Sequence, residues 1–386
     1  MRRSGNLLDE HLHRLAALPA HGNTILGRDQ LVKGLLLSFF DPMARSLRRI
    51  EDCGDFQGDL RLDKLARSTT ADALAAFDPQ LLVPLIDDLQ QRVPNLGDAD
   101  GLEGITRQII AADGTYMTTL CDVAWAMRQK NRDGGVQGQV RANVQLDAGN
   151  WIPRVLTVSG DDGHSEAAAF AADLLPGVLY VVDRNFVEFG FLGAVLDKGS
   201  DFVVRIKSNQ PAMTVVQTLP PSAADVEAGV IAEEVVRLPG RDAPAGLFRC
   251  ITIESTDRSG ESQALRLLTN LPAATVGAHV VGAVYRLRWQ IELFFKWLKT
   301  WAGMDHLLST SRNGITTQLY IAVIAVLMMY VQSGYRVSVY ALAALGRVAR
   351  GQMSIQEAMA VIAKRERERS LERARQARLR ARKKLA

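Results

Sequence analysis

Polar side chains of an unusual mixture recur along the segment 285–299. At roughly 100° per residue of an α-helix, one face would carry a phenol, one carboxylate and several cations: Tyr285, Arg288, Glu292, Lys296 and Lys299, with Trp289 beside them. The opposite face is apolar and would anchor the helix in a core. A carboxylate among cations suits a place where a metal ion meets a polyanion, because the carboxylate can bind the metal and the cations can bind phosphate oxygens. The same pattern also fits a solvated face with a Glu292–Lys296 ion pair.

Two aspartates elsewhere in the chain follow apolar runs. Asp113 directly follows the apolar run 109–112, and Asp183 directly follows the apolar run 178–182. Ligands of open α/β sheets bind at strand ends, so we expect the two aspartates to face one another across adjacent strands, with Glu292 on a helix packed over them. Such an oxygen-rich site prefers Mg²⁺ or Mn²⁺. Two ions would activate a water or a sugar hydroxyl and stabilise the leaving oxygen of a phosphodiester. Each aspartate alone is equally consistent with an ordinary strand-end or turn residue.

The residues between about 104 and 208 must position these groups. Apolar and alternating patterns bounded by turn residues predict strands, and three- and four-residue apolar spacing predicts helices. The expected strands are 105–113, 141–146, 152–158, 177–183 and 202–206, and the expected helices are 165–174 and 186–196. We therefore predict an α/β fold, a mixed sheet with flanking helices.

Other regions surround this sheet. The patterns predict that the first hundred residues are helical, that 209–271 is β-rich, and that the chain after 299 is helical with a charged end. Helices are expected at 29–38, 42–49, 70–77, 79–93, 316–330 and 340–350, and strands at 230–238, 248–255 and 264–268. We divide the chain into an all-helical N-terminal DNA-binding domain (1–100), a catalytic core (101–208 and 272–335), a β-rich insertion (209–271) and a helical basic C-terminal region (336–386). DNA binding by the first hundred residues is expected from their clustered arginines, and the alternative is a helical cap on a larger domain.

Composition narrows the class of protein. The net charge is +4, yet residues 364–386 alone carry 11 Lys or Arg and 3 Glu, which leaves −4 for the rest. A basic run of this density engages nucleic acid or forms a solvated helical tail. The cysteines, Cys53, Cys121 and Cys250, form no disulfide or zinc pattern. The polar start does not fit a signal peptide, and the longest apolar run, 319–331, is short of the roughly 20 residues that span a bilayer. We expect a cytoplasmic protein, with 319–331 as a buried core helix.

The motifs together resemble those of a known family. The spacing Tyr285-x2-Arg288-x3-Glu292-x6-Lys299, with Asp113-Gly114-Thr115 and a strand that ends in Asp183-Arg184, resembles the YREK-signature class of bacterial insertion-sequence transposases, the insertion-sequence-four family. These are DDE transposases with an RNase H-like catalytic core. The resemblance covers about residues 104 to 330. One departure is Asn185, where family members often have glycine; asparagine tolerates a left-handed backbone better than most residues.

The resemblance implies roles for these residues. Asp113, Asp183 and Glu292 would be the catalytic triad that binds two Mg²⁺ or Mn²⁺ ions, and Tyr285, Arg288 and Lys299 would position the DNA of the transposon end. The β-rich insertion resembles one that this class uses to handle a hairpin DNA intermediate. Arg205 and Lys207 alternate along the strand after Asp183, so they lie on one face near the site and are further candidates for DNA binding.

We therefore predict a transposase of a bacterial insertion sequence. It would bind terminal inverted repeats, cleave DNA with Mg²⁺ and transfer the freed strand to target DNA, by cut-and-paste through a hairpin. The expected partners are the double-stranded DNA of the transposon ends and of the target, and a second protomer on that DNA, in the cytoplasm at the nucleoid, with no membrane. Two alternatives stay open: an RNase H-like nuclease without strand transfer, and a non-enzymatic DNA-binding regulator.

Overall fold

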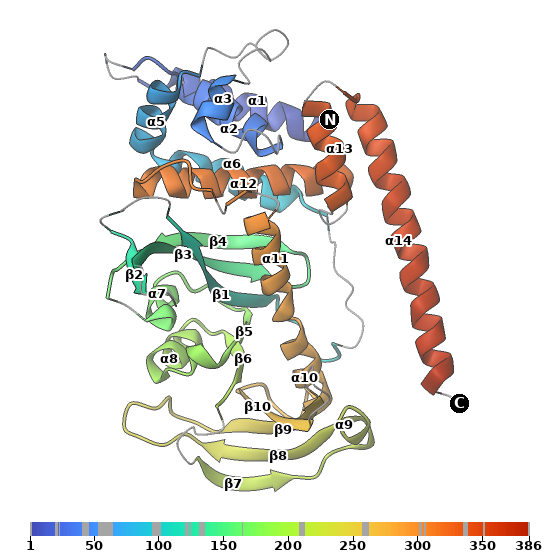
Figure 1. The fold of residues 1–386 in the computed structure, drawn as a ribbon. Coiled ribbons are helices and arrows are strands. Elements are labelled where there is room, and N and C mark those ends of the chain that lie inside the picture. Colours follow the sequence, from blue (N-terminus) through green and yellow to red (C-terminus); the bar gives the residue numbers. More distant parts are fainter. Residues whose placement is uncertain are drawn as a thin grey trace. The chain divides into compact units, whose positions relative to one another are not determined.

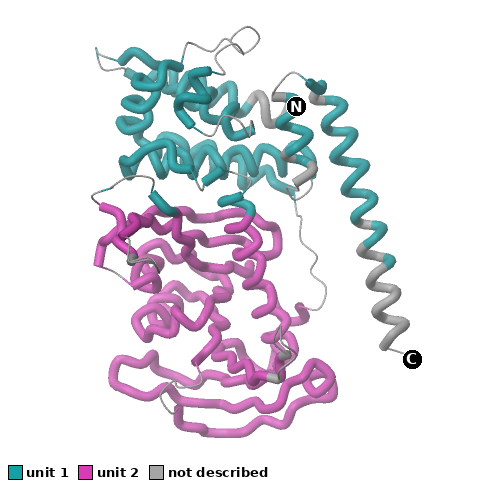
Figure 2. The backbone as a smooth tube through the Cα atoms, viewed as in Figure 1, with its two compact units in different colours: residues 1–96, 118–123, 297–386 teal, residues 97–117, 124–296 magenta. Residues whose placement is uncertain are grey.

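The structure, a computed structural model, falls into two compact units (Figure 2). Unit 1 comprises 1–96, 118–123 and 297–386, and unit 2 comprises 97–117 and 124–296. Each unit is therefore assembled from separate stretches of the chain. The residues described are 2–384, apart from 20, 21, 23, 41–45, 53–64, 95–101, 120–122, 124, 131–135, 164, 208–212, 257–261, 301, 302, 305, 335–338, 350 and 351.

A ten-stranded mixed sheet forms the frame of unit 2 (Figure 1), in the order β2-β3-β1-β5-β6-β10-β9-β8-β7 with β4 paired to β3. The strands β1, β5 and β6 are parallel, and β6 meets β10 in antiparallel pairing. The bounds are β1 Ile109–Thr118, β2 Met127–Lys130, β3 Val136–Asp147, β4 Ile152–Ser159, β5 Leu179–Val182, β6 Asp201–Arg205, β7 Thr214–Leu219, β8 Val230–Arg237, β9 Phe248–Thr256 and β10 Ser262–Thr269.

Helices cover both faces of the central strands. Because side chains alternate along a strand, Ile110, Tyr180 and Phe202 share one face, where they pack with residues of α7 and α8 in a single core cluster. The helix α10 contacts β5 and β6, and Figure 1 shows it on the side away from α7 and α8. The helical bounds in unit 2 are α7 Glu166–Ala171, η3 Arg184–Phe186, α8 Phe189–Asp197, α9 Ala223–Glu227 and α10 Ala278–Arg286; α11, Trp289–Thr300, begins in unit 2.

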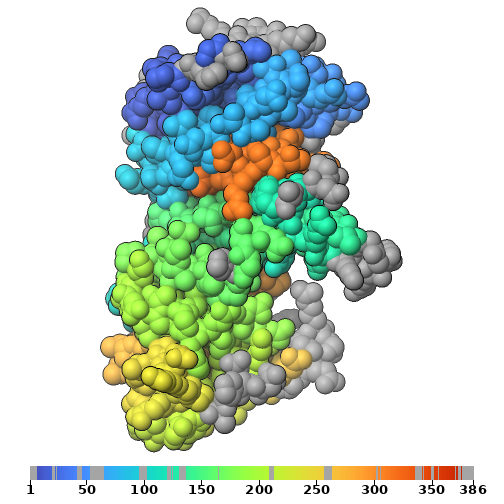
Figure 3. All heavy atoms as spheres, turned by 90° about the vertical axis from the view of Figure 1, so that its left-hand side faces the viewer, coloured from blue at the N-terminus to red at the C-terminus, as the bar shows by residue number. Residues whose placement is uncertain are grey.

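The strands of the segment 209–271 extend the central sheet. In this segment β8 pairs with β9, β9 pairs with β10, and β10 pairs with β6. Inside it, the buried Arg249 forms an ion pair with Glu233 at 2.6 Å and donates to the carbonyl oxygens of Leu271 and Val276. These bonds tie β9 to the chain that leads into α10. In the space-filling view the segment forms the yellow-green to yellow surface of unit 2 (Figure 3).

Unit 1 is helical and is built around α12. This helix contacts α2, α5 and α6, begins where the Ser311 hydroxyl accepts the amide of Gly314, and ends at Gly334, whose φ of 72° is left-handed. It is long and apolar enough to cross a membrane, but 83% of its apolar window is buried within the protein, so the predicted core helix at 319–331 is confirmed. The bounds are α1 Arg2–Ala17, α2 Arg28–Phe40, α3 Leu47–Asp52, α5 Arg67–Ala76, η2 Pro79–Leu82, α6 Val83–Arg92, α12 Arg312–Ser333, α13 Val339–Ala349 and α14 Ile355–Lys384.

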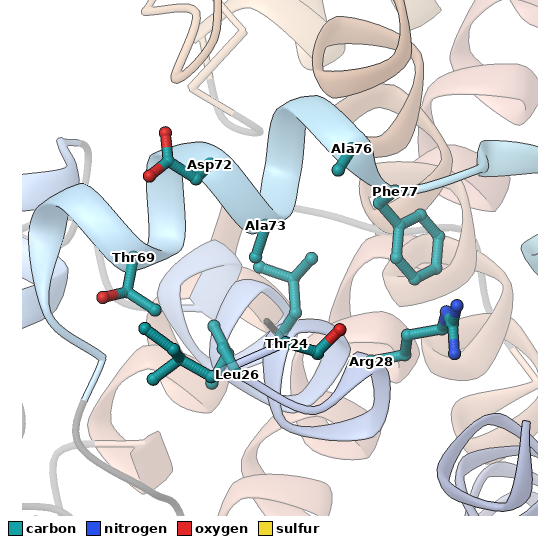
Figure 4. Close-up of a pocket in the computed structure, with 10 residues that line it drawn as sticks. Thr24, Leu26, Arg28, Thr69, Asp72, Ala73, Ala76 and Phe77 are labelled. Carbon is teal, nitrogen blue, oxygen red and sulfur yellow. The ribbon is translucent and has the colours of Figure 1, made fainter. Parts of the chain in front are cut away.

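A cavity of about 450 Å³ lies in unit 1 beside α2 and α5 (Figure 4). Leu26, Ala73 and Phe77 give it a mostly apolar lining, and the Arg28 guanidinium donates to the carbonyl oxygen of Pro19 at 3.0 Å. Figure 4 shows the carboxylate of Asp72 turned away from the other labelled side chains. The cavity belongs to the packing of the helical unit and holds no carboxylate cluster among the described residues that line it.

Two expectations from the sequence are wrong in detail. The segment 285–299 is not one helix: α10 ends at Arg286 and α11 begins at Trp289. Between them the backbone bonds tighten to a three-residue span, from Arg288 N to Tyr285 O and from Ile291 N to Arg288 O. Asp113 does not end its strand either, because β1 continues to Thr118. The elements α1, β2, β7 and α9 were not predicted; β7, for example, is exposed along most of its length and has no buried face to mark it.

Candidate active site

Asp113 and Asp183 lie side by side on β1 and at the end of β5. The parallel register pairs Ile109 with Leu179 and Ala111 with Val181, and two residues beyond these pairs Asp183 lies within electrostatic reach of Asp113. Neighbouring strands are about 4.8 Å apart. The last residue of β5 is Val182, so Asp183 leaves the sheet, and its carboxylate accepts the amide of Asn185 at 2.6 Å. Asp113 alternates with Ile110 and Ala112 and so points to the face of the sheet that α10 covers, whereas Asp183 lies within electrostatic reach of both Tyr285 of α10 and Glu166 of α7.

Arg288 connects this pair to the helices. One guanidinium nitrogen, Nη1, lies 3.5 Å from the Asp113 carboxylate and 3.2 Å from the Glu292 carboxylate. The tight turn between α10 and α11 makes this possible, because it places Arg288 between Tyr285 and Glu292 at a change of helix. The side chains of Arg288 and Asp113 are 16% and 18% exposed, and that of Glu292 is 40% exposed. Glu292 thus forms the open side of the cluster.

The pKa of Asp113 is raised to about 7, chiefly by burial and by the negative charge of Glu166, with a further contribution from Asp183. The Arg288 cation and the Gly114 amide oppose this rise without cancelling it. Burial, with the neighbouring carboxylates, therefore favours the neutral form of the Asp113 carboxyl. A raised carboxyl pKa of this origin is typical of functional sites.

Glu166 is a site residue that the sequence did not reveal. It begins α7, whose first turn is capped by Ser165, and it approaches Gly114 of β1 from the opposite side of the sheet to α10. Burial raises the pKa of Glu166, and the Arg141 cation opposes this rise. The Oε1 atom of Glu166 is buried and has no hydrogen-bond partner. Carboxylates are common in the first turn of a helix because they interact favourably with the helix dipole. The position of Glu166 in the sequence therefore did not indicate a functional role. His164, two residues earlier in the chain, lies outside the described residues.

The cations and the phenol occupy different positions around the carboxylates. Burial raises the pKa of Tyr285, and its hydroxyl lies within electrostatic reach of Arg288, Arg205 and Asp183. Arg205 ends β6 and Lys207 follows it as an exposed residue. Trp289 is 49% exposed, and Lys296 is exposed. Lys299 lies seven residues after Glu292 on α11, in the part of that helix that belongs to unit 1. The structure thus groups Tyr285, Arg205 and Arg288 with the carboxylates.

The donor set fits a divalent cation by its chemistry. Within the described part of the chain no three Asp, Glu, His or Cys side chains are close enough together to hold a metal ion, and the Arg288 cation lies between two of the predicted ligands. However, Glu166 is close enough to raise the pKa of Asp113, and one of its carboxylate oxygens is buried without a hydrogen-bond partner. Hard oxygen donors of this kind favour Mg²⁺ or Mn²⁺. Asp113, Asp183 and Glu292 are the residues that would hold it.

The fold and the site define a class: a mixed α/β protein with an acidic cluster on its central parallel strands and cations around it. Within that class the match is specific, because residues 104–328 fit the Transposase DDE domain family. The matched region includes every carboxylate of the cluster. The chain belongs to this family.

Relatives with curated names point the same way. The chain is 27% identical over 198 residues to a protein of Sinorhizobium fredii that is assigned as a transposase, a match that covers 50% of this chain and 53% of the relative. It is also 34% identical over 74 residues to a protein of Synechocystis assigned as a transposase of an insertion sequence element, over 18% of this chain and 22% of the relative. The chain therefore spans about half the length of the first of these relatives, and less of the second.

Among solved structures, the chain is similar to a piggyBac transposase in a synaptic complex with hairpin DNA. The TM-score is 0.39 and the identity 10%, over 95% of this chain and 79% of that chain. A likeness of this size does not establish a shared fold.

Proposed function

We propose that this chain is the transposase of a bacterial insertion sequence, of the YREK-signature class, with an RNase H-like core. The observation that carries the proposal is the parallel pairing of β1 with β5, with Asp183 within electrostatic reach of Asp113 and Arg288 in contact with both Asp113 and Glu292. Family membership over 104–328 supports it. The proposed substrates are the inverted repeats of the transposon ends and a target duplex, bound by at least two protomers in the cytoplasm.

The proposed chemistry is phosphoryl transfer without a covalent protein–DNA intermediate. Asp113, Asp183 and Glu292 would hold Mg²⁺ or Mn²⁺, and the bound metal supplies activation of the attacking oxygen and stabilisation of the leaving one. Water first cleaves the strand and frees a 3′-hydroxyl, which then attacks a phosphodiester and releases its 3′-oxygen. A hairpin on the transposon end rests on the family resemblance alone.

The surrounding residues would position the DNA strand. The raised pKa of Tyr285 keeps the phenol protonated at neutral pH, so it can donate a hydrogen bond to a phosphate oxygen. The Arg288 guanidinium has a planar fork of donors that suits phosphate as well as carboxylate. Arg205, Lys207 and Lys299 remain proposed DNA contacts, and the division into residues 1–100, 101–208 with 272–335, 209–271 and 336–386 remains a proposed domain plan.

The test is strand cleavage and joining by the purified full chain. End-labelled DNA that carries the sequence flanking the coding region is incubated with Mg²⁺ and a supercoiled plasmid. We expect cleavage and a joined product, and a loss of about 10³-fold or more in each of Asp113→Asn, Asp183→Asn and Glu292→Gln. Asp242→Asn, an exposed carboxylate of the same unit, is the matched control and should cleave normally.

Each failure has a distinct meaning. Cleavage that survives in all three site variants places the chemistry elsewhere. Cleavage without a joined product identifies a nuclease instead of a transposase. Specific binding with no cleavage in Mg²⁺ or Mn²⁺ leaves the DNA-binding regulator.

A further inference from the structure

Trp151 has a backbone conformation that is unusual for its residue type. Among the described residues it is the one position other than glycine with a positive φ, at 61°. A left-handed backbone brings the Cβ close to the following carbonyl oxygen, so glycine or asparagine is the usual residue in such a turn. Strain of this kind persists only where the surroundings hold it, and it is frequent at functional sites. The strain at Trp151 therefore indicates a role for its indole side chain.

The turn between β3 and β4 imposes this conformation. The side chain of Asp147, the last residue of β3, is buried, and its carboxylate accepts the amides of Gly149 and Asn150 at 3.1 and 3.0 Å. The same carboxylate accepts the side-chain amide of Gln108 at 2.6 Å. The Trp151 amide donates to the carbonyl oxygen of Asp147 at 2.7 Å. These bonds hold the turn in one conformation, so the sheet fixes the direction in which the indole points.

The indole of Trp151 reaches the start of α11. Its Nε1–H donates to Oε1 of Gln290 at 2.6 Å, in a part-buried bond between residues that are 139 positions apart in the chain. Gln290 lies in the first turn of α11, and its own amide donates to the carbonyl oxygen of Leu287 at 2.9 Å. Both partners belong to unit 2. The bond therefore ties a turn of the sheet to the connection between α10 and α11.

This hydrogen bond adjoins the candidate active site without entering it. Gln290 lies midway between Arg288 and Glu292 in the sequence. At about 100° per residue, Gln290 and Glu292 lie on different faces of α11, so Trp151 contacts the helix away from the carboxylate. Arg288 is 3.5 Å from Asp113 and 3.2 Å from Glu292. A small shift of the connection between α10 and α11 would therefore change both distances.

We propose that Trp151 is a positioning residue: through Gln290 it fixes where α11 begins relative to β1, and so where Glu292 lies. Arg288, in the same connection, is held in place by the same bond. The proposal rests on the proposed function for the reaction that this positioning serves. The backbone strain at Trp151 is then the cost of directing an indole N–H, which neither glycine nor asparagine carries, at the helix.

The first measurement needs neither metal nor DNA. Hydrogen exchange of the full chain in EDTA is compared between wild type and Trp151→Phe, which keeps an aromatic ring and removes the indole N–H. Loss of this hydrogen bond should speed exchange in residues 287–293 about fivefold. Gln290→Met should have the same effect, and the double variant no larger one, because both changes remove one bond. Trp125→Phe, in the same unit, is the matched control and should leave 287–293 unchanged.

The second measurement tests the positioning itself. Trp151→Phe should weaken binding of Mn²⁺, followed through the EPR signal of the free ion, about tenfold. It should lower kcat for DNA cleavage and leave KM unchanged, because the residue touches no DNA in the proposed arrangement. Gln290→Met should give the same pattern. A merely structural residue would lower the unfolding temperature without changing the Mn²⁺ affinity of the folded protein, so thermal unfolding of each variant is measured as well.

Unchanged exchange of 287–293 in both single variants would overturn the proposal, as would faster exchange with unchanged Mn²⁺ affinity, or a parent that binds no Mn²⁺. The result separates from that of the proposed function. If the variants exchange faster and bind Mn²⁺ more weakly while the parent joins no DNA, the positioning role stands and the transposase proposal fails. If the parent cleaves and joins DNA and Trp151→Phe equals it in exchange, Mn²⁺ affinity and kcat, only the positioning proposal fails.

Discussion

Asp113 is held in the folded protein in surroundings that disfavour its charge. Its pKa of about 7 lies above the ordinary value of 3.8, first through burial and then through Glu166. A folded-state pKa above the unfolded one means that the native state binds more protons between about pH 4 and pH 7. The contribution of Asp113 to stability therefore falls as pH rises through this window. Arg288 reduces this penalty but does not remove it.

Asp113→Asn should consequently stabilise the metal-free protein while it abolishes the proposed cleavage. At pH 8 we expect a gain of roughly 1–3 kcal/mol in the free energy of unfolding, which shrinks as pH approaches 4 because the wild-type side chain is then neutral as well. Denaturant unfolding in EDTA across this range measures it, with Asp242→Asn as the exposed control. A gain that does not depend on pH would contradict the assignment.

Glu166, which lies on the side of the sheet away from α10, contributes to the raised pKa of Asp113 and so to its loss of stability at higher pH. Glu166→Gln removes the charge of this side chain, so we expect the pKa of Asp113 to fall. The unfolding midpoint of unit 2 should then vary less with pH between roughly pH 5 and pH 8, where Asp113 titrates in the folded protein. The exposed Glu103→Gln serves as control. An unaltered pH dependence would show that Glu166 does not act on Asp113.

At the scale of elements, one carboxylate fixes the start of α10. Asp225 of α9 accepts both the backbone amide and the ring Nδ1 of His279, each at 2.8 Å, and it also accepts the amide and hydroxyl of Ser222. Burial alone would raise the pKa of Asp225, but the hydrogen bonds from Ser222 and His279 bring it below its usual range. The segment 209–271 thereby holds the helix that carries Tyr285.

Asp225→Asn should destabilise unit 2 by about 1–3 kcal/mol at neutral pH, since it weakens a capping box and removes the charged acceptor of the part-buried hydrogen bonds from Ser222 and His279. The folded pKa is depressed, so this stability is present above the unfolded pKa near 4 and is lost as pH falls through the lower folded value. The difference between wild type and variant should narrow in acid, as measured by thermal unfolding. Ser222→Ala should have a smaller effect of the same direction.

Gly114 allows β1 to pass between Glu166 and Arg141. A Cβ added there would overlap the Glu166 carboxylate and lie 2.9 Å from Cδ of Arg141, which is buried and bonded to Asn143. We expect Gly114→Ala to cost about 1–3 kcal/mol, with part of the loss recovered when Glu166→Ala is added. Gly190 of α8 has nothing within 4 Å of an added Cβ, so Gly190→Ala is the control. Equal effects of the two alanines would refute the close packing.

At the scale of the whole molecule, charge is concentrated in α14. The buried side chains that α14 shares with α13, Ala358 and Ile362, lie near its start. Three ion pairs within the helix involve Arg365, Arg369 and Arg375. After Glu372 the sequence has seven cations and no carboxylate. By sequence, the end of α14 is therefore strongly basic.

Deletion of residues 370–386 removes seven cations and one carboxylate, which changes the net charge from +4 to −2. We expect unit 1 to keep its unfolding temperature, and non-specific duplex binding to weaken with a salt slope that is shallower by about 0.9 for each phosphate that is no longer neutralised. Electrophoretic mobility shift at two salt concentrations measures this. Unchanged affinity would leave the basic end as a solvated helix.

Much of the central sheet follows from local pattern. The runs that precede Asp113 and Asp183 are apolar because parallel strands are buried on both faces, and the structure shows that these two strands are neighbours. The chain could not show that β1 extends to Thr118, because Asp113 and Gly114 interrupt its apolar pattern. Nor could it show the break at Leu287–Arg288, since no proline or glycine marks it and the helical spacing of apolar residues continues through it.

The sequence alone determined the residue types of the site, the family to which they point, and the strands that carry the aspartates, because these depend on composition and on the alternation of neighbouring residues. Only the tertiary structure decided that Arg288 lies between Asp113 and Glu292, that Glu166 joins the cluster from α7, and that the indole of Trp151 reaches Gln290. These contacts join residues from separate elements, and several depend on turns or on opposite sides of a sheet. Periodicity along a chain contains no information about such distances, whereas packing fixes them.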